Sequence, residues 1–203
     1  MQQMKPFSEA CEQNKEPILA VLREIFPLQN QQSVLEIGSG TGQHAVFFAK
    51  QLPHLNWQTS DLAHNHAGIH AWLAEEKLTN VLPPLLIDAK DTSWPVQKNS
   101  FDAVFSANAV HIMSWPEVVG MFVGIGNALK ASNATLCLYG PFNYGGKFTS
   151  ESNAYFDQCL KQNDPNSGVR DFEALDGLAS KCGLKLSNDF AMPANNRTLV
   201  WRR

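Results

Sequence analysis

The sequence predicts an α/β fold, a doubly wound sheet of seven mostly parallel strands with helices on both faces and an antiparallel last strand. Strand-like apolar runs alternate with amphipathic helical segments along the chain, which is typical of parallel sheets. One of these strands runs through a glycine-rich turn into a helix. The last two strand-like segments are joined by a loop too short for a parallel crossover, so this pair must be antiparallel.

The expected elements follow one another in a regular order. Pro17 suits the first turn of a helix and opens an amphipathic segment at 18–26, which Pro27 ends. Strands and helices then alternate, with strands expected at 33–37, 55–59, 85–87, 101–107, 135–139, 184–192 and 197–202, and helices at 42–51, 64–77, 116–130, 150–162 and 171–182.

Composition restricts the class of protein. The 203 residues, of which 44% are hydrophobic and 17% charged, suffice for a single domain with a sizeable core. The formal net charge is −3 and the 16 Lys and Arg are scattered, which argues against a nucleic-acid partner. No apolar run is long enough for a membrane span, and residues 1–16 lack the apolar segment of an export signal. The spacing of the cysteines predicts neither disulfides nor a metal site, so we expect reduced thiols in a cytoplasmic protein: Cys11, Cys137, Cys159 and Cys182.

The most informative stretch runs from Val34 to Gly42 and reads VLEIGSGTG. It combines a buried strand, an acidic residue and three glycines at alternate positions, and glycine leaves no side chain where a ligand must approach. A dinucleotide-binding turn needs the spacing G-x-G-x-x-G, whereas Gln43 stands here at the place of its third glycine. The alternative is a structural turn that binds nothing.

With Glu36 two residues before the first glycine, this stretch resembles motif I of the class I S-adenosylmethionine-dependent methyltransferases. The apolar segment 101–107, followed by Asn108 and His111, resembles motif IV of the same superfamily. The resemblance implies a Rossmann-like seven-stranded sheet and S-adenosyl-L-methionine as cofactor. Its implied cofactor contacts are Glu36, Gly38, Ser39, Gly40, Thr41, Gly42, His44, Asp61, Leu62, Asp88, Ala89 and Asn108.

Acidic residues at the strand ends fit such a ligand. The carboxyl ends of parallel strands share one edge, so Glu36, Asp61, Asp88 and Asn108 are expected to face one crevice. Asp61 could accept both ribose hydroxyls, and it could also cap the helix that follows it. Asp88 could accept from the adenine amino group, or could be an ordinary turn residue. His44 either touches the amino-acid end of the cofactor or simply packs.

Four further segments resemble the methyltransferase-like 26 family, a domain-of-unknown-function family, and extend the likeness over almost the whole chain. They read NKEPIL at 14–19, YGPFNYGG at 139–146, GVRDFE at 168–173 and PANNR at 193–197. Family relatives often carry an arginine at the position of Gln13, so no ion pair of that arginine is carried over. The resemblance implies no particular substrate.

Several residues are candidates for catalysis and for substrate contacts. His111 could act as a general base, or could pack against a nearby carbonyl, and Asn108 at the same edge could orient the atom that receives the methyl group. Residues 1–32 are expected to close over the crevice above the sheet core at 33–203, with Gly145 and Gly146 as a hinge in a second covering loop. Candidate substrate contacts on these pieces, each with solvation or capping as the alternative, are Asn14, Lys15, Asn143, Tyr144 and Arg170.

Other functions are weighed against this hypothesis. His64, His66 and His70 are expected on a solvated helix face, because zinc needs three or four convergent ligands, and no metal is predicted. We therefore expect a cytoplasmic methyltransferase that acts on a small molecule through O, N or S. A non-catalytic cofactor-binding module acting through a partner protein is the alternative, and Gln43 disfavours a nicotinamide oxidoreductase. The helix at 116–130 is a candidate oligomer surface.

Overall fold

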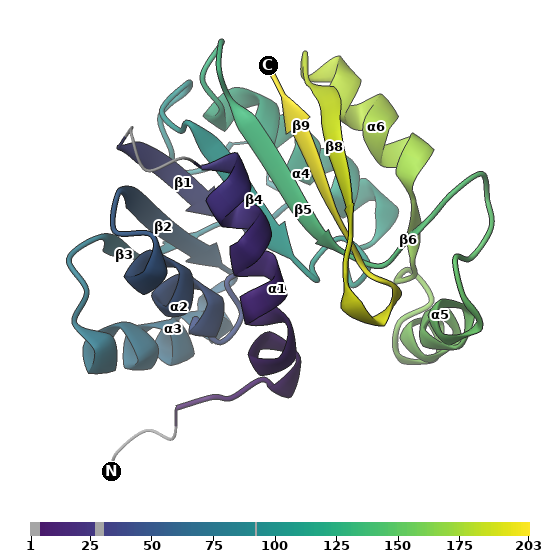
Figure 1. The fold of residues 1–203 in the computed structure, drawn as a ribbon, viewed down its shortest axis with the longest axis horizontal. Helices are drawn as coiled ribbons and strands as arrows, with labels where there is room; N and C mark the ends of the chain where they lie inside the picture. The colour runs from purple at the N-terminus through teal and green to yellow at the C-terminus, as the bar shows by residue number, and fades with distance from the viewer. Residues whose placement is uncertain (1–4, 27–30, 92) are drawn as a thin grey trace.

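A computed structural model describes residues 5–26, 31–91 and 93–203. Its centre is a seven-stranded sheet in the order β3-β2-β1-β4-β5-β9-β8 (Figure 1). β9 is antiparallel to both of its neighbours, and the other pairs are parallel, which confirms the predicted fold class. The strands are β1 (Gln32–Glu36), β2 (Leu55–Asp61), β3 (Val81–Leu86), β4 (Ala103–Ala107), β5 (Thr135–Gly140), β8 (Lys185–Ala191) and β9 (Arg197–Arg202).

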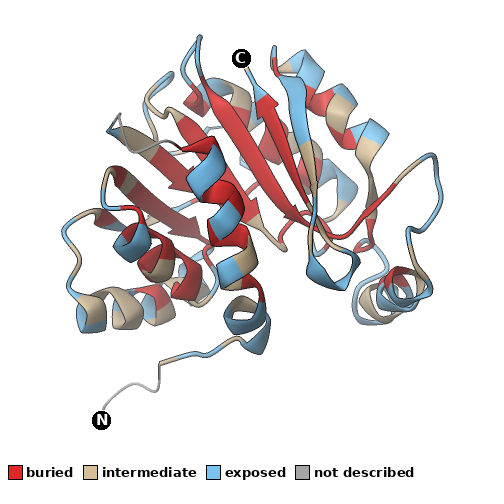
Figure 2. Ribbon diagram, viewed as in Figure 1, coloured by how far each residue is buried: buried red, intermediate tan, exposed pale blue. Residues whose placement is uncertain are grey.

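Helices cover both faces of the sheet. Side chains alternate across a strand, so Val34 and Phe105 pack on the side of α1 and α2, whereas Leu35 and Val104 pack on the side of α4 and α6. Figure 2 shows that the central strands are buried along most of their length. The helices are α1 (Glu9–Ile25), α2 (Gln43–Gln51), α3 (Ala63–Glu76), α4 (Trp115–Ala128), α5 (Glu151–Asn163), α6 (Phe172–Lys181) and the short η1 (Pro193–Asn195).

The prediction for the first helix was wrong about its start. α1 begins at Glu9, two turns before Pro17, and Ser8 caps it by accepting a hydrogen bond from the Cys11 amide at 3.3 Å. The first two turns are mostly polar, so apolar periodicity gave no sign of them. Pro17 therefore lies inside the helix, where it has no N–H to donate to the carbonyl of Gln13. Pro27, expected to end this helix, lies outside the described residues.

Two strands also differ from the prediction. β3 begins at Val81 rather than residue 85, and it contains Pro83 and Pro84, which are tolerated because β3 is an edge strand. β4 begins at Ala103, since Phe101 makes only an isolated bridge to Leu129.

A second, two-stranded sheet was not predicted. It pairs β6 (Phe142–Asn143) with β7 (Arg170–Asp171) in parallel and ties the loop after β5 to the start of α6. Two-residue strands carry no periodicity that a sequence pattern could reveal.

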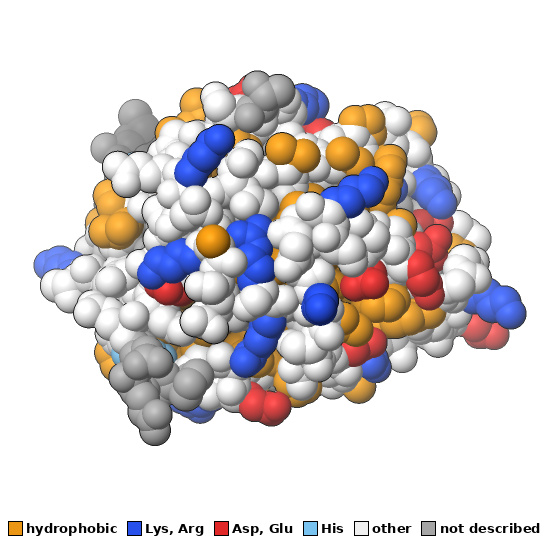
Figure 3. Space-filling model, turned by 90° about the horizontal axis from the view of Figure 1, so that it is seen from above, with side chains coloured by type: hydrophobic (Ala, Val, Ile, Leu, Met, Phe, Trp, Pro, Cys, Tyr) orange, Lys and Arg blue, Asp and Glu red, His pale blue; other side chains and the backbone are white. Residues whose placement is uncertain are grey.

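The surface is mixed in character. On the face seen in Figure 3, Lys and Arg side chains are interspersed with acidic and uncharged ones. Within residues 5–26, 31–91 and 93–203, no helix is both long and apolar enough to cross a membrane.

Candidate functional site

A cavity of about 430 Å³ opens at the carboxyl edge of the sheet, where strand order reverses between β1 and β4. Such a switch point is the usual ligand site of open α/β sheets. We call it the switch-point cavity; it is lined by the segments that follow β1 to β4, at 37–41, 61–62, 87–89 and 107–109, and by residues of α1, α3 and α4. Ten of the twelve residues predicted for the cofactor line it: Gly38, Ser39, Gly40, Thr41, His44, Asp61, Leu62, Asp88, Ala89 and Asn108.

The three motif glycines serve different purposes. All have positive φ, at 73°, 57° and 91° for Gly38, Gly40 and Gly42. A Cβ on Gly38 would lie 3.3 Å from the Ala109 side chain, and one on Gly42 would lie 3.1 Å from the Ile69 backbone, so these two allow neighbouring segments to approach. A Cβ on Gly40 would meet nothing within 4 Å. Gly40 is therefore the glycine that keeps space open in the cavity, whereas Gly42 does not line it.

Asp61 fixes the glycine loop. Its Oδ2 accepts from the Gly40 amide at 2.6 Å, and its Oδ1 accepts from the Leu62 amide at 2.7 Å and from Asn65 Nδ2 at 2.8 Å. Asp61 is not the N-cap of α3: Leu62 holds that position and no side chain caps the helix, so the structure supports the place of Asp61 at the cavity and not the alternative capping role. The carboxylate thus links the ends of β1 and β2 on the cavity wall.

The charge of the switch-point cavity is acidic. Asp61, Asp88 and Glu117 line it, and no Lys or Arg is found among its described lining residues. Asp88 also makes the expected turn, since its Oδ1 accepts from the Lys90 amide at 2.9 Å. Glu117 was missed by the sequence analysis; it belongs to the capping box of α4 with Ser114, a signal that the S-x-x-E spacing carries. The cavity therefore favours a ligand with positive charge.

Glu36 does not face the crevice, and that prediction was wrong. It is 2% exposed and its Oε2 accepts from Ser39 Oγ at 2.7 Å and from Trp57 Nε1 at 3.0 Å, beneath the glycine loop. Side chains alternate along a strand, which turns Glu36 toward the same face as Val34. Burial raises the pKa of Glu36 to about 7, the charge of Asp61 adds to this, and the two hydrogen bonds oppose it.

A second cavity, of about 570 Å³, lies beside the first and shares Ala10 and Asn108 with it. We call it the amide cavity, because Gln13, Asn14, Asn108, Asn153 and Asn196 all line it. Asn108 holds its place through a left-handed φ of 56° and an amide hydrogen bond to the Tyr139 carbonyl at 2.9 Å. It is the predicted site residue that joins the two cavities.

His111 lines the amide cavity and is almost fully buried, at 4% exposed. Its Nδ1 has no hydrogen-bond partner among the described residues, and its ring lies edge-on to Phe156 of α5 with 5.3 Å between centroids. Burial lowers the pKa of His111 to about 4, and the positive charge of Arg170 acts in the same direction. The imidazole is therefore neutral at physiological pH, and Nδ1 can accept a hydrogen bond when the ring proton is on Nε2.

His44 connects the two cavities to α1. It lines the switch-point cavity, and its Nε2 lies 2.7 Å from Oδ1 of Asn14, which lines the amide cavity. Burial lowers the pKa of His44 to about 4, although a hydrogen bond to the Cys11 backbone opposes the shift. Asn14 also interacts with the hydroxyl of Tyr139, another lining residue.

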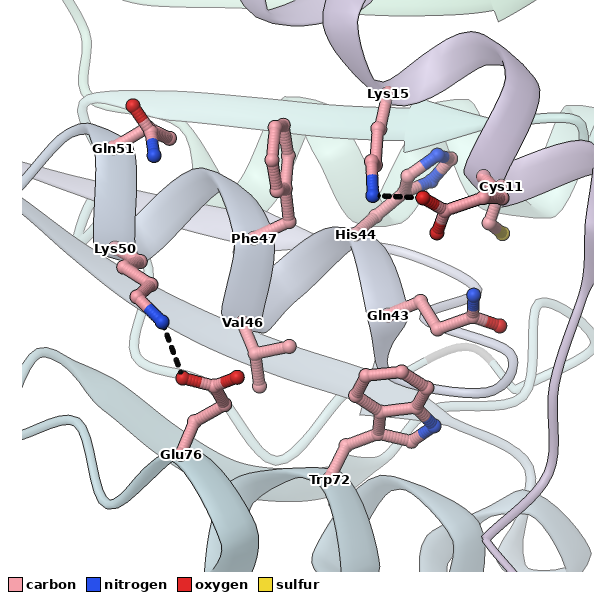
Figure 4. Close-up of a pocket in the computed structure, with 11 residues that line it drawn as sticks. Cys11, Lys15, Gln43, His44, Val46, Phe47, Lys50, Gln51, Trp72 and Glu76 are labelled. Atoms are coloured by element: carbon pink, nitrogen blue, oxygen red, sulfur yellow. Dashed lines mark hydrogen bonds and ion pairs between the residues drawn. The ribbon is translucent and has the colours of Figure 1, made fainter.

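Lys15, predicted as a substrate contact, lies outside both cavities. It lines a groove of about 230 Å³ between α1, α2 and α3 (Figure 4), where its ammonium forms an ion pair with Glu12 and lies 5.0 Å from the centre of the Phe47 ring. The same groove holds the ion pair between Lys50 and Glu76, at 2.9 Å. Both lysines of this groove are therefore paired with glutamates of the protein itself.

Of the five predicted substrate contacts, Asn14 lines the amide cavity, whereas Asn143, Tyr144 and Arg170, like Lys15, line neither cavity. Arg170 donates to the backbone carbonyls of Val110, Met113 and Asn166 and so braces the loop that carries His111. Asn143 is buried in β6, with its Nδ2 3.4 Å from the Val169 carbonyl.

Tyr144 lines a shallow hollow of about 470 Å³ beside η1, and its hydroxyl donates to Asp189 Oδ2 at 2.8 Å. The turn that follows is closed by two hydrogen bonds between Tyr144 and Lys147. Gly145 and Gly146, the predicted hinge, occupy this turn with φ of 57° and 72°.

The predicted solvated histidine face is found for two of its three residues, since His64 and His70 are exposed. His66 is half-buried, with its Nε2 3.0 Å from the Asp61 carbonyl, and His64 also lines the switch-point cavity. In the part of the chain that the structure describes, no group of three His, Cys, Asp or Glu side chains is placed to hold a metal.

Sequence reasoning missed several residues of the amide cavity. Tyr139 precedes the break at Gly140, and Asn153, Phe156 and Asn196 come from α5 and from the segment after η1. These residues meet only through the tertiary fold, and the single hint was the unusual PANN sequence at 193–196.

Comparison with known proteins gives a family and a fold. The chain belongs to the family described as "Protein of unknown function (DUF938)", whose sequence profile matches residues 5–203.

Similar solved structures are methyltransferases by description. They include an O-methyltransferase family protein from Burkholderia thailandensis, with a TM-score of 0.80 and 16% identity over 96% of this chain and 57% of that one. For the mitomycin 7-O-methyltransferase MmcR the TM-score is 0.79 and the identity 16%, over 96% of this chain and 54% of that one. For an O-methyltransferase family 2 protein from Planctomyces limnophilus, in complex with apigenin, the TM-score is 0.78 and the identity 11%, over 96% of this chain and 60% of that one. The chain spans less than two thirds of these proteins, and the likeness at this identity shows a Rossmann-like methyltransferase fold.

Proposed function

We propose that this protein is an S-adenosylmethionine-dependent methyltransferase that acts on a small molecule. The observation that carries the proposal is the acidic switch-point cavity beside the glycine loop, which meets the neutral amide cavity at Asn108. One cavity suits a cationic cofactor and the other suits a methyl acceptor. Their shared wall is where a methyl group would pass from one ligand to the other.

The residues present fit this cofactor. The volume of about 430 Å³ lies within the range of small-molecule sites, roughly 300–1,000 Å³. The acidic wall suits a cofactor that carries a positive sulfonium and would repel the pyrophosphate of a dinucleotide, although Glu117 is also ion-paired with Lys90 at 3.1 Å. Gly40 has no side chain, so a ligand can approach the backbone of the glycine loop at this position. Asp61 is then available to bind the ribose, and Asp88 to bind the adenine.

The cofactor would supply a methyl group on a positively charged sulfur, which becomes a neutral thioether after transfer. The protein's part is to orient the acceptor and to take its proton. Neutral His111 Nδ1 is the candidate proton acceptor, since it is buried, unpaired and on the wall of the amide cavity. Asn108 is the candidate for orienting the acceptor atom. Holding the partners in line can contribute roughly 7–11 kcal/mol.

The open amide cavity favours catalysis over a non-catalytic binding module. Of the loop at 139–148, only Tyr139 and Pro141 line that cavity, and about 570 Å³ beside Asn108 stays open. Our proposal also includes the finer resemblance to methyltransferase-like 26 proteins and a cytoplasmic location, which is supported by four free cysteines.

Calorimetric titration with S-adenosylmethionine and S-adenosylhomocysteine tests the proposal. We expect both to bind the folded protein in the micromolar range. Gly40→Val should abolish this binding, because a side chain would enter the cavity. Gly145→Val is the matched control: Gly145 has the same φ of 57° and likewise has nothing within 4 Å of its Cβ position. The two variants therefore carry similar backbone strain, about 1–2 kcal/mol, and only Gly40→Val should lose the ligand.

Two results would contradict the proposal. The first is the absence of binding heat and of any ligand-dependent change in melting temperature with folded wild-type protein. The second is equal affinity of wild type, Gly40→Val and Gly145→Val for S-adenosylhomocysteine, which would make the glycine loop purely structural.

A further inference from the structure

We propose that the amide cavity selects an acceptor that carries no charge, one that offers hydroxyl or amide groups rather than a carboxylate, a phosphate or an ammonium group. The inference rests on the proposed function, since it names the class of molecule that would receive the methyl group. It follows from the chemistry of the cavity wall.

The wall is polar but uncharged. Four asparagines, one glutamine, one serine, one tyrosine and His111 supply its polar groups, and no Asp, Glu, Lys or Arg is found among its described lining residues. The neighbouring switch-point cavity has three carboxylates, so the contrast between the two walls is sharp. Amide groups both donate and accept hydrogen bonds, and they complement hydroxyl and amide groups of a ligand.

His111 adds no charge to this wall. It is 4% exposed, and Phe156 packs against its ring. Its neutral imidazole leaves Nδ1 without a partner among the described residues, and a Cβ on Gly140 would lie 3.6 Å from this nitrogen and 3.8 Å from the side-chain oxygen of Asn108. A neutral ligand hydroxyl or amide group can donate to this nitrogen or accept from it, whichever ring tautomer is present.

Three charged groups on the elements around the cavity are engaged with other partners. Arg170 is held by three backbone carbonyls of the surrounding loops. Asp157 of α5 accepts from the Val169 amide at 2.8 Å and from Lys161. Arg197 is bound to Asp189 at 2.7 Å. A charged ligand would therefore find no free counter-charge in the described wall, and burying an unpaired charge is strongly unfavourable.

The first turns of α1 give the wall one more neutral group. Gln13 and Pro17 both line the cavity, and Pro17 has no N–H for the Gln13 carbonyl. That carbonyl therefore lacks its usual helical hydrogen bond. Pro17, Pro141 and Phe156 also give the cavity an apolar side, which suits a ligand with a flat or apolar body.

Ligand-observed NMR with four ring-bearing probes tests the inference. Phenol and benzamide are neutral, benzoate is an anion and benzylammonium is a cation. With protein saturated by S-adenosylhomocysteine, we expect the neutral probes to bind at least about tenfold more tightly than either charged probe. Asn196→Asp places a carboxylate in the cavity and should strengthen benzylammonium binding by a similar factor. Asn188→Asp, on the exposed part of β8, makes the same change outside the cavity and should have no such effect.

Each outcome decides the inference. The inference is supported if wild type binds the neutral probes preferentially and if benzylammonium binding becomes stronger in Asn196→Asp but not in Asn188→Asp. Equal or tighter binding of benzoate or benzylammonium to wild type overturns it, and so does the binding of no probe at all. Melting temperatures of both variants, measured without ligand, show that they are folded. Failure of the proposed function is a separate result, because it appears as loss of S-adenosylhomocysteine binding, and the probes can then be titrated into the cofactor-free protein.

Discussion

The buried carboxyl of Glu36 makes the stability of this protein depend on pH in a direction that can be worked out. Burial raises the pKa of Glu36 from its ordinary 4.5 to about 7. Between these two values the folded protein binds more protons than the unfolded chain, so the free energy of unfolding falls as pH rises. The stability from protonated Glu36 is present below pH 4.5 and is lost as pH rises through about 7.

Glu36→Gln removes this dependence, because glutamine stays neutral and can still accept from Ser39 and Trp57. Each pKa unit corresponds to about 1.4 kcal/mol. From about pH 5.5 to about pH 8.5, wild type should therefore lose about 2 kcal/mol relative to Glu36→Gln. His44 and His111, whose pKa burial lowers to about 4, are present in both proteins and cancel in the difference.

Urea unfolding of both proteins at the two pH values measures this difference directly. Glu24→Gln, a matched change on an exposed part of α1, reports what the removal of a surface carboxylate does. If the gap between wild type and Glu36→Gln were the same at both pH values, the buried carboxyl would not titrate near neutrality and the reasoning would fail. A cationic ligand in the adjoining cavity should favour ionised Glu36, so its binding at pH 7 should release protons in wild type and fewer in Glu36→Gln.

Two further predictions concern the backbone of the glycine loop and the pKa of His111. Gly42→Ala should lower the free energy of unfolding by about 1–3 kcal/mol, because φ is 91° and the new Cβ would lie 3.1 Å from the Ile69 backbone. Gly177→Ala, in α6 where a Cβ meets nothing within 4 Å, should instead raise it by roughly 0.5–1 kcal/mol, and thermal unfolding that shows equal losses would contradict this. Arg170→Gln should raise the pKa of His111, because the positive charge of Arg170 lowers this pKa in addition to the effect of burial. An NMR titration of the His111 ring that gives the same pKa in both proteins would refute that role.

The fold and the switch-point cavity could be predicted because their signals are local and the topology is simple. Apolar runs identify the strands, and parallel strands place their carboxyl ends at one edge. That rule brought Asp61, Asp88 and Asn108 to one cavity. It failed for Glu36, the last residue inside β1, because side-chain alternation within a strand takes precedence over the position of the strand end.

The remainder depends on contacts between segments far apart in the chain. The two-stranded sheet of β6 and β7 joins residues 142–143 to 170–171, and no local pattern marks either strand. Arg170 was predicted to contact substrate because it is a charged residue in an unusual segment. The fold instead directs its guanidinium to the backbone carbonyls of Val110, Met113 and Asn166, which the sequence cannot reveal.

The first two turns of α1, which the sequence did not predict, contribute residues to the amide cavity. The two unpredicted turns contain Gln13 and Asn14, and Pro17 follows them, so all three reach the amide cavity from one helix. A proline in a helix interior destabilises it by roughly 3 kcal/mol, and its presence beside a cavity is the kind of local violation expected at a functional site. The glycine loop gives this chain a cavity that its fold class shares, whereas α1 supplies neutral groups that the glycine motif does not specify. Under the proposed function, we therefore predict that substitutions in α1, α5 and the segment after η1 change the choice of acceptor and leave cofactor binding intact.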